Sequence, residues 1–592
     1  MSKLRESGSH RFSLQIFLFI ILVTIAYLQR SDVTLLLFLL LFFSLKKDSY
    51  SLLENTSTKI LFLFLTIGIS FVFDITNVQR GLIGISIVLI LHKVSKGWKI
   101  STNAMLNMSY NLIGIEALYF LLSKFSERIL QFLVFGYDNA FHLSLFRIYS
   151  ISEQFPNSLN NDWPSDFALF RNYSGGYYAV SSFLSSAIVG DTDDASKLLV
   201  GYFLMVFSVF LGILLLSILL IKAISKNSNL FVPSLSVSLA FIASIGILLT
   251  NGYPPYLYAL FILLLLLVRL HNCADFAIML AWSAIAFHLT LISQPLVSWN
   301  LIPLFLLLFG FFFKKLFRRN IMRNDVKSIL WAILLGLFTL FLVKDTAGSF
   351  GISQLIAAGG VQPLTLRYWL ITLFVALLVL YFAFTRGKVF LCIALVSSAS
   401  APFIFLVGLT VVKTGTVGYY AIKQGYIWSY LVSLSALLFY QLEQTQRVTN
   451  FGKKKPTPSK VLIFVLLVGS LQGATTPKVF NGAFMGTLKN VVFASAGPES
   501  MWSTMGLDAR QLIYAAKSGK RISNDCLLYK SNLSFSDLGS RWLNVLASKN
   551  VTEACFAVYW NSDTLNDTEI SERILISGIS VRVISAQDPS KT

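Results

Sequence analysis

Residues 198–221 read LLVGYFLMVFSVFLGILLLSILLI and contain no Asp, Glu, Lys or Arg. An α-helix rises about 1.5 Å per residue, so this run can cross the roughly 30 Å hydrocarbon core of a bilayer. Similar apolar runs recur from residue 13 to residue 474. Over all 592 residues 55% are apolar and 13% are charged, against about 25% charged residues in soluble domains. The composition excludes a soluble enzyme, a disordered chain and a coiled-coil rod.

We therefore expect residues 1–474 to form an all-α polytopic membrane bundle of about fifteen transmembrane helices. The predicted spans are 13–29, 31–45, 60–75, 81–95, 105–123, 197–221, 230–250, 255–268, 275–292, 300–313, 328–343, 368–385, 389–411, 426–442 and 460–474. Residues 475–592 are soluble in composition and mix helical with strand patterns, which predicts a small C-terminal α/β domain. Its Cys526 and Cys555 fall on predicted strands. Outside the cytoplasm the two could form a disulfide, and the alternative is two free thiols.

The basic residues predict the orientation, because Lys and Arg gather in loops that stay in the cytoplasm. With Lys3, Arg5 and Arg11 inside, the runs Lys314–Arg323 and Lys453–Lys455 also face the cytoplasm. This arrangement accounts for the net charge of +20, from 48 basic minus 28 acidic residues, without a nucleic-acid partner. We expect a multi-pass plasma-membrane protein with a cytoplasmic N-terminus and an extracytoplasmic C-terminal domain.

The external loop 124–196 is the most informative segment, because it is long and mixes aromatic with acidic residues. Its apolar stretches are too short or too interrupted to span, so we expect amphipathic helices on the outer leaflet. Asp138 follows the first stretch, in GYDNAFH, and His142 stands four residues later, on the same face of a helix. Asp138 is then a candidate general base with a polar neighbour. The alternative is a helix-capping Asp beside a surface His.

A second candidate is the segment YYAIK, from Tyr419 and Tyr420 to Lys423, which we place in the last external loop before the tail. A lysine at the interface can hold a phosphate as a point charge. Tyrosines offer a sugar ring a flat face and hydroxyl groups. The alternative is an interfacial aromatic belt with a Lys whose ammonium reaches the headgroups.

Other polar positions are weaker candidates. His288 and Glu116 fall within predicted spans, where an ionisable residue either serves function or pairs inside the bundle. The cluster Asp191, Asp193 and Asp194 resembles a D-x-D metal site, but it also stands where it would cap the following helix. We expect no required cofactor, and a divalent cation is possible.

The order of these features resembles the GT-C superfamily of membrane glycosyltransferases. GYDNAFHL matches the acidic motif of its large external loop, with Asp138 in the acidic position. The segment Tyr173–Tyr178 partly matches a Tyr-Pro-Pro-Gly-x-His-like motif, although both prolines are missing and Tyr178 replaces the His. YYAIK resembles the Tyr-Tyr-x-x-Lys segment of actinobacterial members that use polyprenyl-phosphate sugars. Here the loop follows the fifth span and not the first, so four more helices precede the usual core.

The resemblance implies an inverting glycosyltransferase that moves a sugar from a polyprenyl phosphate to an extracytoplasmic glycan, lipid or protein. Asp138 would deprotonate the acceptor hydroxyl and Lys423 would hold the departing phosphate. The substrate-binding residues would be His142, Tyr173, His288, Tyr419, Tyr420 and Lys423. The alternatives are a transporter or flippase of a lipid-linked saccharide, or a non-catalytic cell-envelope assembly protein. A transporter would lead us to expect an internal repeat and charged residues within the spans. The sequence shows no internal repeat and few charges within the predicted spans.

Cysteine labelling tests the orientation, in a chain whose four native cysteines are replaced by serine. Ser536→Cys in the tail should react with a membrane-impermeant maleimide in intact cells. Lys454→Cys should react only after permeabilisation, because its basic loop stays inside. The reverse pattern would place Asp138 and Lys423 in the cytoplasm and remove the proposed chemistry.

Overall fold

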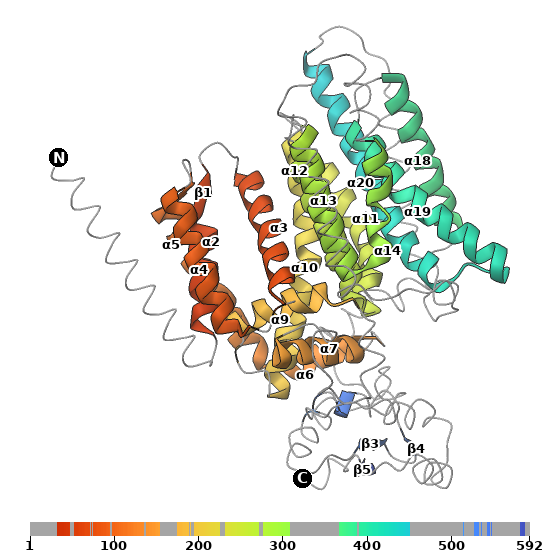
Figure 1. Cartoon of the computed structure of the whole chain (residues 1–592). Helices are drawn as coiled ribbons and strands as arrows, with labels where there is room; N and C mark the ends of the chain where they lie inside the picture. Colours follow the sequence, from red (N-terminus) through yellow and green to blue (C-terminus); the bar gives the residue numbers. More distant parts are fainter. Residues whose placement is uncertain are drawn as a thin grey trace, which may run out of the picture. The chain divides into compact units, whose positions relative to one another are not determined.

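The computed structural model describes residues 32–47, 52–71, 73, 75–94, 98–134, 138–153, 174–188, 190, 194–224, 231–271, 276–307, 366–386, 390–449, 513, 526–531, 534–535, 542–544, 546 and 581–585. Among them, five helices are long and apolar enough to cross a membrane: Thr102–Ser123, Ala195–Ile224, Pro233–Thr250, Pro254–His271 and Cys392–Thr414. The chain is therefore a helical membrane protein, as its composition predicts (Figure 1). Helices are the form that satisfies every backbone hydrogen bond within one segment in hydrocarbon.

Helices coincide with most of the predicted spans that fall on described residues, and the span 300–313 is described only as far as residue 307. The early helices are α2 (Val33–Ser44), α3 (Leu52–Ser70), α4 (Asn77–Val94) and α5 (Thr102–Ser123). The later ones are α10 (Ala195–Ile224), α11 (Phe231–Thr250), α12 (Pro254–His271), α13 (Phe276–Ser293), α14 (Pro295–Ser298), α18 (Leu366–Arg386), α19 (Phe390–Thr414) and α20 (Tyr419–Thr449). The predicted spans 13–29, 328–343 and 460–474 lie outside the described residues, so the count of fifteen stays a prediction.

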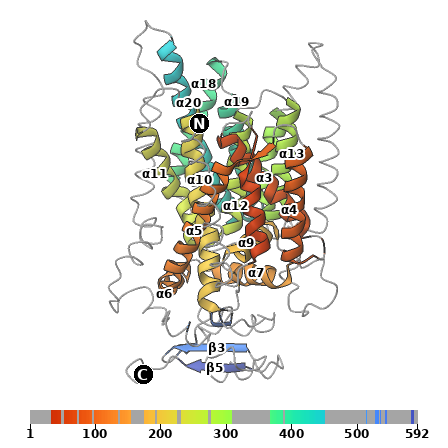
Figure 2. The ribbon, with the colours of Figure 1, turned by 90° about the vertical axis from the view of Figure 1, so that its left-hand side faces the viewer.

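The chain divides into two compact units, each considered by itself. The first contains residues 1–172, 178–205 and 493–592, and the second contains 173–177 and 206–492. In the first unit α2 packs against α4 and α5, as Figure 1 shows, and Figure 2 gives the view turned by 90°. A Cβ on Gly84 would lie 2.5 Å from the Phe38 ring. Glycine at this position therefore allows α4 to approach α2 closely, as small residues do between membrane helices.

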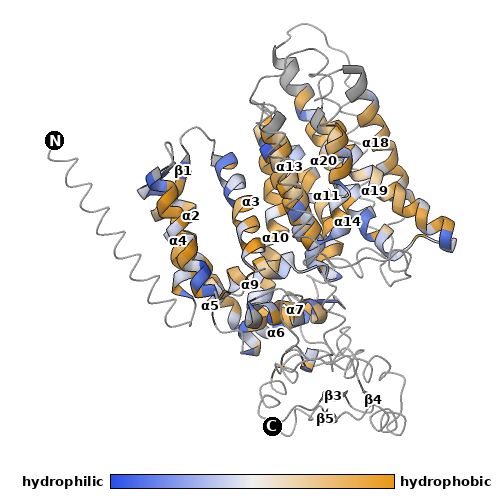
Figure 3. Ribbon diagram, viewed as in Figure 1, coloured by the Kyte–Doolittle hydropathy of each residue, from blue (hydrophilic) through white to orange (hydrophobic). Residues whose placement is uncertain are grey.

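Helices α4 and α5 expose large apolar side chains, as lipid-facing helices do. In Figure 3 much of the α4 ribbon has the hydrophobic colour. A short antiparallel ladder joins β1 (Leu45–Lys47), which follows α2, to β2 (Trp98–Ile100), which precedes α5. Helix α2 therefore ends where α5 begins. This direction agrees with the alternation of spans predicted from the basic residues.

The long loop 124–196 forms the helices α6 (Ser126–Val134), α7 (Asn139–Ser152) and α9 (Gly176–Ile188). Helices were expected here, but α9 differs from a helix lying on a membrane surface. Most of its side chains are buried, among them Tyr178, Ser182 and Phe183. The segment GYYAVSSFLSSAI has no charged residue, so no side of α9 must face water.

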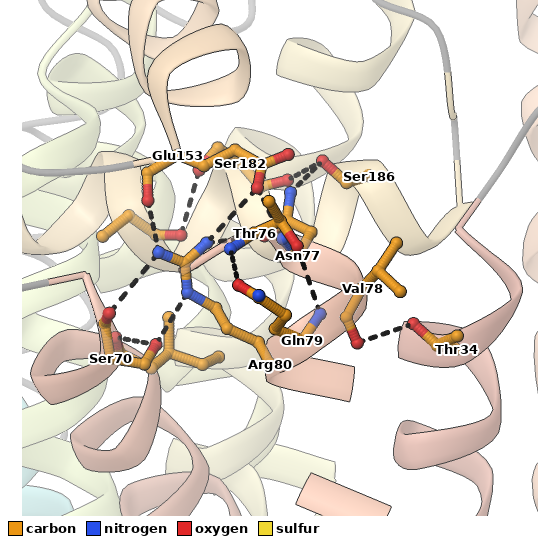
Figure 4. A network of polar contacts seen from close by, with 12 residues as sticks. Thr34, Ser70, Thr76, Asn77, Val78, Gln79, Arg80, Glu153, Ser182 and Ser186 are labelled. Carbon is orange, nitrogen blue, oxygen red and sulfur yellow. Dashed lines mark hydrogen bonds and ion pairs between the residues drawn. The ribbon is translucent and has the colours of Figure 1, made fainter. Parts of the chain in front are cut away.

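A buried arginine fastens this loop to the spans of the first unit (Figure 4). Arg80, in the first turn of α4, donates to the side chains of Ser70 (3.1 Å) and Asn77 (2.9 Å) and to the backbone oxygen of Glu153. Its guanidinium lies 4.1 Å from the centre of the Phe71 ring and 3.8 Å from the Glu153 carboxylate. One side chain thus holds the end of α3, the start of α4 and the end of α7.

Glu153 ends α7 in the left-handed region, at φ 56°, which a residue other than glycine adopts at some cost. The contacts of Arg80 hold it there. Burial raises the pKa of the Glu153 carboxyl, whereas the backbone N–H of Asn77 and the charge of Arg80 lower it. The Asn77 amide also reaches the hydroxyl of Ser186 in α9, at 3.3 Å. The network therefore connects α4, α7 and α9.

In the second unit α20 is the central helix, packed by α11, α18 and α19. Its Trp428 ring stacks on Phe403 of α19 at 4.5 Å between ring centres. Its Tyr430 hydroxyl meets the Ser217 hydroxyl of α10 at 2.6 Å. Helix α20 starts at Tyr419, seven residues before the predicted span, so YYAIK is helical and does not lie in a loop as predicted.

The C-terminal region contains a small sheet in the order β4-β3-β5, with β3 (Cys526–Ser531) antiparallel to β4 (Ser534–Phe535) and parallel to β5 (Val581–Ser585). The strand predicted at Cys526 is thereby confirmed. A parallel pair needs a crossover connection, which suits an α/β arrangement. Cys555 lies outside the described residues. Its disulfide with Cys526 and the complete α/β domain stay predictions.

Replacing the arginine tests this network. Arg80→Leu should lower the free energy of unfolding by about 2–3 kcal/mol, because it leaves the acceptors around Glu153 buried without their donor. Thermal unfolding in detergent measures the loss. The exposed Arg128→Leu in α6 is the control and should stay within about 0.5 kcal/mol. Equal effects of the two substitutions would show that Arg80 does not fasten the loop.

Candidate functional site

The start of α20 places a lysine among tyrosine rings in the second unit. The Lys423 Nζ lies 3.4 Å from the ring centre of Tyr253 and 3.8 Å from that of Tyr419. The rings of Tyr256 and Tyr420 follow, each at 5.5 Å. The whole residue is only 4% exposed. We name Lys423 and these four tyrosines the tyrosine cage.

Two chain turns assemble the tyrosine cage. Gly252 adopts φ 76° after α11, a left-handed conformation that glycine allows, and α12 then begins at Pro254, where proline suits a first helical turn. Gly415 adopts φ 71° after α19, and α20 begins at Tyr419. The first turns of α12 and α20 thus meet, so both helices begin at the same end of this unit. That relation agrees with the predicted alternation of spans.

The tyrosine cage favours an anion near the Lys423 ammonium. The start of α20 carries the positive end of its helix dipole, and its first turn contains no acidic residue. Ring faces stabilise a desolvated ammonium by roughly 2 kcal/mol, which is weaker than a charge-assisted contact with an anion. The Tyr419 hydroxyl lies 3.3 Å from the Tyr253 hydroxyl, so phenol groups gather beside the charge.

The segment that follows Tyr173 packs tightly in the same unit, although Tyr173 itself lies outside the described residues. A Cβ on Gly176 would come within 2.6 Å of the Ser293 hydroxyl at the end of α13. The Tyr177 ring meets Tyr258 of α12 edge to face at 5.7 Å. Gly176 therefore allows the start of α9 to lie directly on α13.

Two intramembrane candidates are buried. His288 lies in α13 and is 3% exposed, and its Nδ1 has no hydrogen-bond partner among the described residues. Glu116 in α5 is buried in the first unit. Binding of substrate by His288 stays a prediction.

Asp138 stands at the N-cap position of α7, in the first unit, and is partly exposed. Its side chain makes no capping hydrogen bond to the first turn. The backbone N–H of His142 donates to the Asp138 carbonyl at 3.0 Å, which confirms the helical spacing of the two residues. The alternative interpretation, a capping Asp beside a surface His, is wrong about the histidine, because His142 is buried.

His142 is part of a stack of aromatic side chains. Its Nδ1 hydrogen-bonds the Tyr178 hydroxyl of α9. The Tyr178 ring in turn stacks on Tyr149 at 5.6 Å, and burial raises the pKa of Tyr149 above its ordinary value. His142 therefore fixes α7 to α9, and its contact with a substrate stays a prediction.

One residue of the acidic cluster, Asp194, caps a helix, as one interpretation predicted. The Asp194 carboxylate accepts from the backbone N–H groups of Ser196 (2.8 Å) and Lys197 (3.1 Å) at the start of α10. Asp191 and Asp193 lie outside the described residues. Within the described part of the chain, no group of three His, Cys, Asp or Glu side chains could hold a metal ion.

Sequence reasoning brought Tyr419, Tyr420 and Lys423 together but missed Tyr253 and Tyr256. The available signal was Tyr-Pro-Pro-Tyr at the start of α12, because proline at the first turn fixes where the flanking tyrosines project. No protein family, curated protein or solved structure matches this chain. The interpretation of the site therefore rests on the residues alone.

Substitution of one ring tests the tyrosine cage. Tyr253→Leu should lower the free energy of unfolding by about 2 kcal/mol, because a buried ammonium loses its closest ring face. Tyr253→Phe keeps the ring and should cost less than about 1 kcal/mol. Tyr381→Leu, at an exposed position of α18, is the control for loss of a tyrosine. If the Leu and Phe variants at Tyr253 unfold alike, the ring face does not hold Lys423.

Proposed function

We propose that this protein is an inverting membrane glycosyltransferase that uses a polyprenyl-phosphate sugar and an extracytoplasmic acceptor. The observation that carries the proposal is the tyrosine cage, which surrounds a buried ammonium with phenol rings at the start of α20. A lipid phosphate would exchange weak ring contacts for charge-assisted hydrogen bonds with Lys423. The tyrosine faces would hold the sugar beside it.

In the proposed reaction Lys423 stabilises the phosphate that departs from the anomeric carbon. Negative charge on that phosphate grows as the glycosidic bond breaks, so the ammonium binds the transition state more strongly than the donor. A single carboxylate base without a nucleophilic partner implies direct attack by the acceptor and inversion at the anomeric carbon. No metal is needed in this scheme, although a divalent cation is compatible with it.

Asp138 is the proposed base. Its side chain is partly exposed at the start of α7, and in the proposal this carboxylate accepts the proton of an acceptor hydroxyl. The Arg80 network fixes the end of α7, and the His142–Tyr178 bond fixes its middle. In this proposal Asp138 acts on the acceptor, and Lys423 acts on the phosphate of the donor.

A transporter or flippase of a lipid-linked saccharide could use the same tyrosine cage, and turnover separates the two functions. Asp138→Asn should reduce sugar transfer by about 10²- to 10⁴-fold, because the amide cannot accept the proton, and should leave donor binding unchanged. Lys423→Ala should weaken donor binding roughly 10- to 150-fold, and Lys423→Arg should retain part of it. Transfer from radiolabelled polyprenyl-phosphate sugars, with the full chain in lipid nanodiscs, measures both.

The controls are Glu127→Gln in α6 and Lys413→Ala, an exposed lysine at the end of α19. Both should leave transfer and binding unchanged. Donor binding that depends on Lys423, with no transfer by the native chain, would favour the transporter. If Lys423→Ala binds the donor as well as the native chain does, the proposed site is wrong.

A further inference from the structure

The residue after Lys423 belongs to a second polar pair in the same unit. Gln424 donates from Nε2 to the Asn300 Oδ1 at 2.6 Å. Asn300 follows the short helix α14, and 124 positions of sequence separate the two residues. Both side chains are fully buried, at 0% exposure. The pair therefore forms an amide contact deep in the protein, beside the start of α20.

Each amide has one group left over. The Asn300 Nδ2 and the Gln424 Oε1 have no hydrogen-bond partner among the described residues. The orientation of an amide is assigned from its surroundings, but reversing both amides changes nothing essential. The bond then runs from Asn300 to Gln424, and one donor and one acceptor again remain. The pair thus offers one open NH2 group and one open carbonyl oxygen in either arrangement.

The stability of the fold does not explain this pair. A buried donor or acceptor without a partner costs free energy, whereas two apolar side chains of the same shape avoid that cost. Two buried amides with two unmet groups therefore contribute less to the stability of the fold than an apolar pair such as Leu with Met. Such a pair is expected where a ligand supplies the missing partners.

We propose that Asn300 and Gln424 form a subsite for a hydroxyl group of a neutral polyol ligand. A hydroxyl can donate to the Gln424 oxygen and accept from the Asn300 amide, so it matches both open groups. A phosphate lacks the donor and an ammonium lacks the acceptor, so each would leave one group unmet. This inference rests on the proposed function, in which the hydroxyl belongs to the sugar of the donor lipid.

The proposal gives neighbouring positions of α20 different tasks. Consecutive α-carbons lie about 3.8 Å apart, and their side chains point in different directions around a helix. Lys423 faces the start of α12, whereas Gln424 faces Asn300 after α14, and α12 packs against α14. The lysine would bind the charged part of a sugar phosphate and the amides its neutral part.

The test replaces both amides, with Asn300→Leu and Gln424→Met in one chain, so that neither is left with a lone partner. The full chain in nanodiscs is titrated with polyprenyl phosphate and with its mannosyl, glucosyl, galactosyl and arabinosyl esters. We expect the native chain to prefer one ester over the bare lipid. In the double variant the affinity for that ester, relative to the bare lipid, should fall about 10-fold. Its affinity for the bare lipid should equal that of the native chain, and its melting temperature should be no lower. The control is Ser435→Ala, elsewhere in α20, which removes a buried hydrogen bond to the backbone oxygen of Cys392 in α19. This variant should keep the preference.

Several results would overturn the subsite. A double variant that keeps the preference for the ester, or that melts far lower, would show that the pair is structural and holds a water molecule. If neither lipid binds to the native chain, the proposed function fails separately. The pair is then tested with free monosaccharides, which should raise the melting temperature of the native chain and not that of the double variant. Equal shifts in the two chains would exclude the hydroxyl subsite.

Discussion

The absence of water in the hydrocarbon core governs this structure, because every backbone group there must find its partner within the chain. Helices satisfy this requirement, and several polar side chains of this protein lie near helix ends. Two buried cations occur in the opening turns of helices, Arg80 in α4 and Lys423 in α20. Both lie over aromatic rings, at 4.1 Å and 3.4 Å from the ring centres. Helix beginnings are the positive ends of the helix dipole, so each cation needs compensation.

The two cations are compensated differently, and that difference separates structure from proposed function. Arg80 has several oxygen acceptors and a carboxylate within 4 Å, and these contacts fasten a long loop. Lys423 lies on the faces of Tyr253 and Tyr419, which a phosphate can replace at little cost. The oxygen contacts of Arg80 suit a structural anchor, whereas the ring faces around Lys423 support the binding site that we propose. In our proposal the open amide groups of Asn300 and Gln424 add a subsite for a neutral hydroxyl.

Much of the helical layout was predictable, because membrane helices are apolar over a length that bilayer thickness sets. The same criterion placed the start of α20 too late. YYAIK is too polar to count toward a span, yet it has no helix breaker after Gly418 and forms the first turns. The loop helices were expected, but burial of α9 was not, because local periodicity does not show what packs against a helix. Tyr253 and Tyr419 are 166 positions apart, so their meeting has no local signal. Asp138 was identified from its position, and its missing cap bond is visible only in the fold.

The central claim is that the Lys423 ammonium leaves its rings to bind a lipid phosphate. A cryo-electron-microscopy structure of the full chain in a nanodisc with polyprenyl phosphate tests it directly. The account predicts a phosphate oxygen about 2.7–2.9 Å from the Lys423 Nζ, between the rings of Tyr253 and Tyr419. A bound phosphate elsewhere, with Lys423 still against the same rings, would contradict the account.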